Sequence, residues 1–122
     1  METQEALTIS SEGAVAVACF TGACICDVDE IARASAALRR HMETQRPTGL
    51  IFDFTGVKFF SSQVLGLLLE ARGRLQPQGG RVAVSALSPQ LERVFRITSL
   101  DQIFAFYPDR PAAIRQLSAE PR

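Results

Sequence analysis

The stretch Leu50–Leu69 reads LIFDFTGVKFFSSQVLGLLL. Its first five residues are nearly all apolar, which is typical of a central strand that is covered on both faces. Thr55-Gly56 indicates a turn, and the apolar run Val64–Ala71 predicts a helix buried against a sheet. A buried strand followed by a buried helix is typical of an α/β fold.

The N-terminal part of the chain predicts two strands and one helix. Leu7–Ser10 and Val15–Phe20 are strand-like, and Glu12-Gly13 indicates a turn between them. From Asp27 onward, apolar residues recur every three or four positions, which predicts a helix. Asp27 followed three residues later by Glu30 has the form of a capping box at the start of this helix.

Two further strand–helix pairs follow Leu50–Leu69. Arg81–Ser85 predicts a strand, and Ser88-Pro89 places an N-cap before a first-turn proline, which is typical of a helix start. Ile103–Tyr107 predicts the last strand, and Pro111 opens a final helix.

The predicted order is β-β-α-β-α-β-α-β-α, with about five strands and about four helices. Strands joined by single helices need right-handed crossovers, so we expect a mixed, mostly parallel sheet with one antiparallel hairpin. No repeat or linker interrupts the pattern, and we expect a single domain over residues 1–122, with residues 1–5 as a disordered tail.

The composition excludes several classes of function. The 122 residues are 47% hydrophobic, and 13 basic residues balance 13 acidic ones, as in a small globular domain. We expect no nucleic-acid partner and no anionic membrane surface as a partner, since both attract basic proteins. The longest apolar run, Ala14–Phe20, is too short for membrane insertion, and we find no signal-peptide pattern, so we expect a cytoplasmic protein.

Few residues are available for catalysis or metal binding. The only histidine is His41, which we interpret as a solvated helix residue, and the cysteines are Cys19, Cys24 and Cys26. The Cys24-x-Cys26 spacing places both thiols on one face of a strand, and we interpret them as core residues rather than a redox or metal pair. Neither a G-x-S-x-G elbow nor a phosphate-binding loop is present, and we expect no metal or cofactor.

Asp53 ends a predicted central strand, where open α/β sheets bind their ligands. The phosphoacceptor of a response-regulator receiver domain occupies a comparable place, but it requires an acidic pair after the first strand and a lysine after the last. The only lysine here is Lys58. We therefore interpret Asp53 as an acceptor of hydrogen bonds from turn amides around Gly56.

Leu50–Leu69 resembles the signature of STAS domains, the fold of bacterial anti-sigma-factor antagonists. That signature is an apolar strand ending in Asp, a short turn, Val-x-Phe, and then Asp-Ser-Ser/Thr-Gly-Leu at the start of a helix. The resemblance continues through Pro77–Val84, Leu87–Phe95 and Thr98–Phe104. It covers about residues 7–118 and implies the same strand–helix order as the hydrophobic pattern.

The resemblance implies a protein-binding module that is not an enzyme. In STAS-domain antagonists, this loop and helix start dock an anti-sigma factor that is also a protein kinase, and the kinase phosphorylates the second hydroxyl residue of the motif. Aligned by position, the family Asp falls on Ser61, the first Ser on Ser62, the phosphoacceptor on Gln63 and the Gly on Val64. Gln63 has no hydroxyl, so docking through residues 56–66 is expected to be independent of phosphorylation.

Ser61 and Ser62 keep hydroxyls inside the motif. We interpret one of them as the N-cap of the following helix. The alternative is that Ser62, or after it Ser61, is a substitute phosphoacceptor, although one residue step turns a side chain by about 100° on a helix. Phe59 is expected in the core and Phe60 on the rim of the docking surface. The expected partner-binding residues are Thr21, Gly22, Asp53, Lys58, Phe60, Ser61, Ser62, Gln63 and Val64.

Three hypotheses of function follow. The first is an anti-sigma-factor antagonist or related partner-switching regulator, whose partner is an anti-sigma factor or protein kinase. The second is a scaffold that assembles with other STAS domains in a signalling complex, or a subunit of a transporter complex. The third is an enzyme that uses Asp53 and Ser62 around a bound phosphate, but the sequence offers these residues no acid–base partner.

Overall fold

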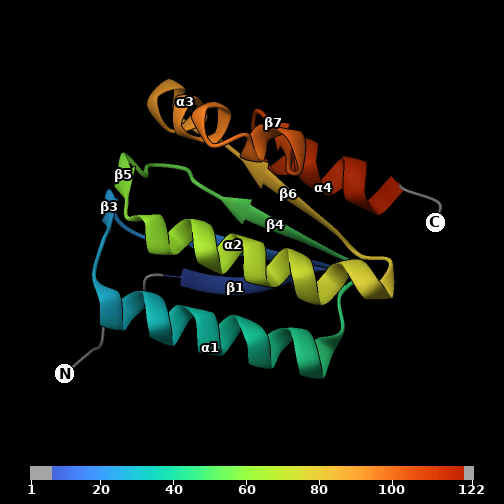
Figure 1. The fold of residues 1–122 in the computed structure, drawn as a ribbon. Helices are drawn as coiled ribbons and strands as arrows, with labels where there is room; N and C mark the ends of the chain where they lie inside the picture. Colours follow the sequence, from blue (N-terminus) through green and yellow to red (C-terminus); the bar gives the residue numbers. More distant parts are fainter. Residues whose placement is uncertain (1–6, 120–122) are drawn as a thin grey trace.

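A five-stranded mixed sheet forms the centre of the structure, a computed structural model that describes residues 7–119 (Figure 1). In spatial order, β1 is followed by β2, β4, β6 and β7. β1 pairs with β2 in antiparallel fashion, and every other neighbouring pair is parallel. The α/β class and the mostly parallel sheet are therefore confirmed. These strands span Leu7–Glu12 (β1), Val15–Phe20 (β2), Gly49–Asp53 (β4), Arg81–Ser85 (β6) and Ala105–Tyr107 (β7).

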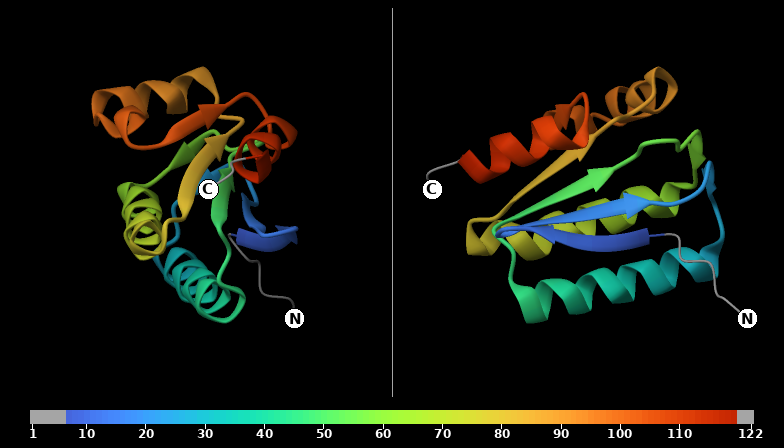
Figure 2. Two further views of the ribbon diagram at one scale, coloured as in Figure 1. Left: turned by 90° about the vertical axis from the view of Figure 1, so that its right-hand side faces the viewer. Right: turned by 180° about the vertical axis from the view of Figure 1, so that it is seen from behind.

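Four α-helices cover this sheet, as expected. They are α1 (Val28–Gln45), α2 (Ser62–Leu75), α3 (Pro89–Ile97) and α4 (Arg110–Ala119). Figure 2 shows α4 on one face of the sheet and both α1 and α2 on the other. Two 3-10 turns, η1 (Gln76–Gln78) and η2 (Leu100–Gln102), complete the connections. The expected tail at residues 1–5 lies outside the described residues.

Side-chain caps fix where the helices begin. The Asp27 carboxylate accepts a hydrogen bond from the Glu30 amide at 2.9 Å, as half of a capping box does. The Ser88 hydroxyl accepts one from the Leu91 amide at 3.3 Å, and Pro89 occupies the first turn. The predicted starts of α1 and α3 are thus confirmed.

Several boundaries differ from the predictions, two of them at the outer strands of the sheet. β1 runs on to Glu12, so the hairpin turn is Gly13-Ala14, and Gly13 takes a φ of 65°, which glycine adopts at little cost. The last strand begins at Ala105 rather than Ile103, because the chain before it closes into η2.

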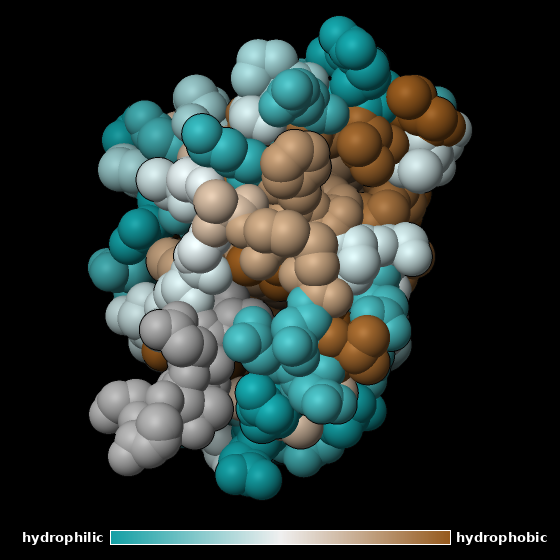
Figure 3. Space-filling view, turned by 90° about the vertical axis from the view of Figure 1, so that its left-hand side faces the viewer, coloured by the Kyte–Doolittle hydropathy of each residue, from teal (hydrophilic) through white to brown (hydrophobic). Residues whose placement is uncertain are grey.

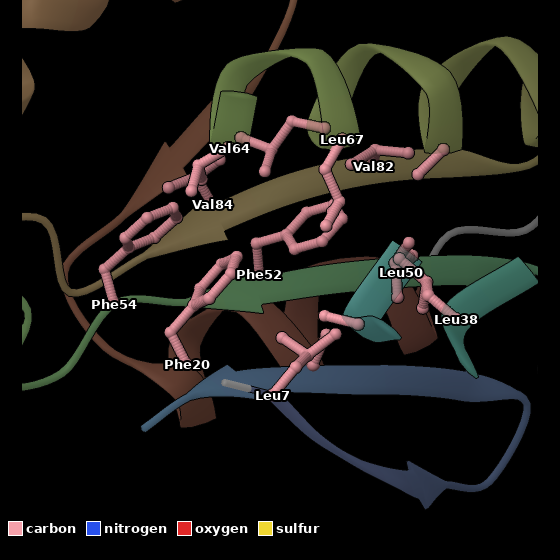
Figure 4. Close-up of a cluster of buried hydrophobic side chains, with 14 of the residues drawn as sticks. Leu7, Phe20, Leu38, Leu50, Phe52, Phe54, Val64, Leu67, Val82 and Val84 are labelled. Carbon is pink, nitrogen blue, oxygen red and sulfur yellow. The ribbon is translucent and has the colours of Figure 1, made fainter. Parts of the chain in front are cut away.

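Strand β4 separates two hydrophobic cores. Leu50 and Phe52 contribute to the larger core beneath α1, α2 and α3, whereas Ile51 contributes to the smaller core beneath α4. Figure 4 shows labelled side chains of β1, β2, β4 and β6 gathered in one cluster with Val64 and Leu67 of α2 and Leu38 of α1. This alternation within one strand explains why Leu50–Phe54 is apolar at every position except Asp53.

Helices α1 and α2 are also joined by polar contacts. The Glu70 carboxylate accepts hydrogen bonds from the Arg39 guanidinium at 2.9 Å and from the Ser35 hydroxyl at 3.2 Å. The hydrogen bond from Arg39 is the main reason why the pKa of Glu70 lies below its ordinary value. The pair is partly exposed, so it aligns the two helices more than it stabilises them.

A cluster of phenylalanine rings closes the end of the larger core that lies near α3. Phe95 is fully buried and makes edge-to-face contacts with Phe106 at a centroid distance of 5.4 Å and with Phe60 at 6.1 Å. It also meets Phe54 at 6.2 Å and Phe104 at 6.4 Å. Helix α3 is therefore anchored by one ring that four others surround.

We expect Phe95→Ala to lower the free energy of unfolding by about 3–5 kcal/mol, because it removes a buried ring and leaves a cavity. Ile97→Ala is the matched control, since Ile97 lies at the end of the same helix and is 75% exposed. This control should change stability by less than about 0.5 kcal/mol. Denaturant unfolding measures both variants, and equal midpoints for Phe95→Ala and the wild type would contradict the anchoring role.

Candidate functional site

Two short strands lie side by side at one end of the molecule (Figure 1). β3 (Cys24–Ile25) follows β2, and β5 (Phe59–Phe60) follows β4. They pair in parallel, with Cys24 opposite Phe59 and Ile25 opposite Phe60. This small ladder was not expected from the sequence. We call its surroundings, residues 21–27 and 56–66, the β3–β5 edge.

Backbone hydrogen bonds hold the two segments of the β3–β5 edge together. The amides of Lys58 and Phe59 both donate to the Ala23 carbonyl, at 2.7 and 3.0 Å. The Ser61 amide donates to the Ile25 carbonyl at 3.0 Å. These bonds bring the loop after β2 against the loop that leads into α2, so that Thr21 and Gly22 belong to the same end of the sheet as residues 56–66.

The orientations of the two phenylalanines are the reverse of the expectation. Phe59 is 64% exposed, whereas Phe60 is part-buried and packs against Phe54 and Phe95. Neighbours on a strand point to opposite sides, and Phe60 lies opposite the buried Ile25. The prediction of Phe59 as core and Phe60 as rim was therefore wrong, and Phe59 is the exposed aromatic residue.

The start of α2 exposes two of the motif positions. Ser62 and Gln63 are exposed in the first turn, whereas Val64 is fully buried. Ser61 occupies the N-cap position, but its side chain makes no cap hydrogen bond. The Ser61 Oγ is buried and has no hydrogen-bond partner among the described residues. Ser61 is thus the N-cap residue by its backbone conformation, and its hydroxyl does not cap the helix.

Asp53 is buried, being 2% exposed, and it faces away from α2. Its carboxylate accepts a hydrogen bond of 2.7 Å from the Ser85 hydroxyl and lies 3.6 Å from the Arg110 guanidinium of α4. These two contacts replace the turn amides around Gly56 that the sequence suggested. Asp53 therefore joins the ends of β4 and β6 to the start of α4.

The predicted partner-binding residues divide by exposure. Asp53 and Val64 are buried, so any influence of theirs on a partner is indirect. Phe60 and Ser61 are part-buried. The exposed members are Thr21, Gly22, Lys58, Ser62 and Gln63. Phe59 is an exposed residue that was not among the predicted ones. It is exposed because it pairs with the exposed Cys24 and not with the buried Ile25, and this pairing could be known only from the ladder.

Figure 3 views the molecule from the β3–β5 end and shows apolar side chains gathered across the middle of this face, with hydrophilic ones around them. Phe59 is the exposed large apolar residue of the β3–β5 edge itself. An apolar centre with a polar rim is typical of a surface that binds another protein.

The three cysteines are free thiols. Cys24 and Cys26 are exposed, so their interpretation as core residues was wrong, because Ile25 between them takes the buried face. A hydrogen bond with Cys24 raises the pKa of the Cys26 thiol. Cys19 is half-buried, and burial raises the pKa of its thiol.

Residues 7–119 offer neither a cluster of metal ligands nor a helix suited to crossing a membrane. Within that range, no three histidine, cysteine or acidic side chains are grouped so that they could hold a metal ion. None of the described helices combines the length and apolar character that a membrane span requires.

The fold has counterparts in known proteins. The family model for the STAS domain matches residues 27–113, so the chain belongs to the STAS domain family. A STAS-domain anti-sigma-factor antagonist from Planctomyces limnophilus is 22% identical, with a TM-score of 0.83 over 94% of this chain and 99% of that one.

Two other solved structures have the same fold. The anti-sigma factor antagonist SpoIIAA in its unphosphorylated form is 19% identical, with a TM-score of 0.82 over 96% of this chain and 100% of that one. An anti-sigma factor antagonist from Mycobacterium paratuberculosis is 24% identical, with a TM-score of 0.79 over 92% of each chain. The STAS fold implied by Leu50–Leu69 is therefore confirmed.

We expect Asp53→Ala to lower the free energy of unfolding by about 1.5–3 kcal/mol, because it removes a buried hydrogen bond to an acidic group and the neighbouring Arg110 contact. Asp101→Ala is the control, since Asp101 is exposed. Denaturant unfolding of both variants measures the difference. An Asp53→Ala protein as stable as the control would show that this contact does not secure α4.

Proposed function

We propose that this STAS domain is a cytoplasmic, non-enzymatic protein-binding module that docks a kinase-type anti-sigma factor through the loop and helix start at residues 56–66. The observation that carries the proposal is the exposed Gln63 in the first turn of α2, where the family motif has its phosphoacceptor. Gln63 offers a neutral side chain that no kinase can phosphorylate. Docking is then constitutive rather than switched.

The geometry of the β3–β5 edge supports this proposal. Ser62 and Gln63 follow the exposed Phe59 closely in the sequence, and backbone bonds to the carbonyls of Ala23 and Ile25 restrain the loop before them. A rigid loop loses little conformational entropy on binding. The edge therefore combines an aromatic anchor with neutral polar neighbours.

The enzymatic hypothesis has less support. Asp53 contacts Arg110 of α4, on the face of the sheet opposite to α2, whereas Ser62 begins α2. The two residues that a phosphate-handling site would need thus belong to different faces. Antagonists of this fold are also typically non-catalytic.

We expect Gln63→Glu to weaken binding to the partner by about tenfold or more, since an unpaired charge in an interface costs at least about 1.4 kcal/mol. A negative charge in the first turn of a helix is itself favourable, so the variant should remain as stable as the wild type. Titration calorimetry against each purified kinase-type anti-sigma factor of the same genome measures the affinity.

Gln116→Glu is the matched control for charge, because Gln116 is exposed on α4, on the opposite face. It should bind like the wild type. If Gln63→Glu also binds like the wild type, then residues 56–66 are not the docking surface.

We further expect no gain of phosphate when the protein is incubated with the bound kinase and ATP, because Ser62 is turned by about 100° from the position of the acceptor. Intact mass spectrometry measures this. A gain in the wild type that disappears in Ser62→Ala would identify Ser62 as the acceptor and would contradict constitutive docking.

A further inference from the structure

Cys24 and Cys26 form a pair of thiols on the surface of the β3–β5 edge. Their Sγ atoms lie 2.6 Å apart, a contact longer than a disulfide bond of about 2.05 Å and short enough for one sulfur to reach the other with little movement. Both side chains are exposed, so small molecules can reach them. Cys19 differs, because it is half-buried on β2.

The strand places the two sulfurs together. Cys24 lies in β3, and Cys26 is the residue directly after this strand. Both side chains therefore project to the solvent side of the chain, while Ile25 between them is buried. A buried Ile25 holds the backbone in place beneath the two thiols. Their contact is therefore a consequence of the fold.

We propose that Cys24 and Cys26 are a modification site at which a low-molecular-weight disulfide, such as glutathione disulfide, converts the dithiol to an intramolecular disulfide. The thiolate of one cysteine attacks a sulfur of the small disulfide, whose S–S bond breaks and releases one small thiol. The thiolate of the second cysteine then attacks the protein-bound sulfur. The Cys24–Cys26 bond forms and the second small thiol leaves.

The reaction is balanced. The two cysteines lose two electrons and two protons, and the small disulfide gains both and becomes two thiols. The second step is intramolecular between sulfurs already in contact, so it outpaces the release of a mixed disulfide. Disulfides of this kind in reducing compartments are usually transient and regulatory.

Closing the bond alters the β3–β5 ladder. Two residues of an extended strand span about 6.6 Å, which is near the upper limit of the roughly 4.4–6.8 Å that separates the Cα atoms of a disulfide and above their commonest separation of about 5.5–6 Å. A disulfide at its commonest geometry thus shortens β3 beside its partner strand. The amides of Lys58, Phe59 and Ser61, which donate to the carbonyls of Ala23 and Ile25, are the groups that this shortening disturbs.

The consequence for binding rests on the proposed function. Phe59 lies opposite Cys24 in the ladder, so a shortened β3 displaces the exposed aromatic residue of the β3–β5 edge. We therefore expect the oxidised protein to bind its anti-sigma partner more weakly than the reduced protein, by several-fold.

The test begins with chemistry that needs no partner. The full chain is reduced, incubated with glutathione disulfide and analysed by intact mass and thiol counting. Wild type and Cys19→Ser should each lose two thiols and two hydrogen atoms without retaining glutathione. Cys24→Ser and Cys26→Ser should instead stop at a glutathione adduct. Wild-type protein that keeps all three thiols, or that only accumulates adducts, would overturn the proposal.

Hydrogen exchange tests the effect on structure. On oxidation, the amides of Lys58, Phe59 and Ser61 should exchange several-fold faster. The Thr48 amide, which donates to Ala14 at 2.9 Å at the opposite end of the sheet, should not change. A disulfide that forms and leaves all four amides unchanged would overturn the coupling between the dithiol and the edge.

Calorimetry of reduced and oxidised protein against the purified kinase-type anti-sigma factors completes the test. The double variant Cys24→Ser/Cys26→Ser, which can form neither the disulfide nor a glutathione adduct at these positions, should bind equally well under both conditions. If no kinase binds even the reduced wild type, the proposed docking function fails, whereas the mass and exchange data still decide the dithiol chemistry.

Discussion

Strand β4 is buried on both faces, and the placement of every other layer depends on it. Its alternating side chains divide between the two cores, with Phe52 on one side and Ile51 on the other. Gly49 allows α4 to approach, since a β-carbon there would lie 2.8 Å from Leu117 Cδ2. A slip of one residue in register would exchange the two faces and place Asp53 among aromatic rings.

The position of the β3–β5 edge follows from this constraint. Because β2 and β4 are parallel neighbours, their carboxyl ends meet at one end of the sheet, and the loops that leave them meet there too. Ladder bonds then tie these loops to each other before α1 and α2 begin. The edge is thus held by the sheet on one side and by two helix starts on the other.

Much of this architecture could be predicted from the sequence. The nearly continuous apolar run at Leu50–Phe54 and the caps at Asp27 and Ser88 are local signals, and local physics is enough to interpret them. Phe59 and Phe60 could not be oriented in this way, because a strand of two residues is too short to show an alternating pattern. Their orientation was set by a partner strand far away in the sequence.

The partners of Asp53 depend on tertiary structure for the same reason. Its position at a strand end was readable from the sequence, but Ser85 and Arg110 reach it only after β6 and α4 have packed. The two cysteines were correctly placed on one face of a strand. Which face it was depended on Ile25, whose burial the local pattern did not reveal.

The two outer strands of the sheet discourage self-association. β7 has only three residues, and β1 is largely polar and exposed beyond Leu7, ending in Ser10, Ser11 and Glu12. Short or polar edges are poor templates for strand pairing between molecules and so protect against aggregation. Because the edge strands β1 and β7 resist such pairing, the protein can expose Phe59 at one end without promoting aggregation. That aromatic surface then remains accessible to a specific partner.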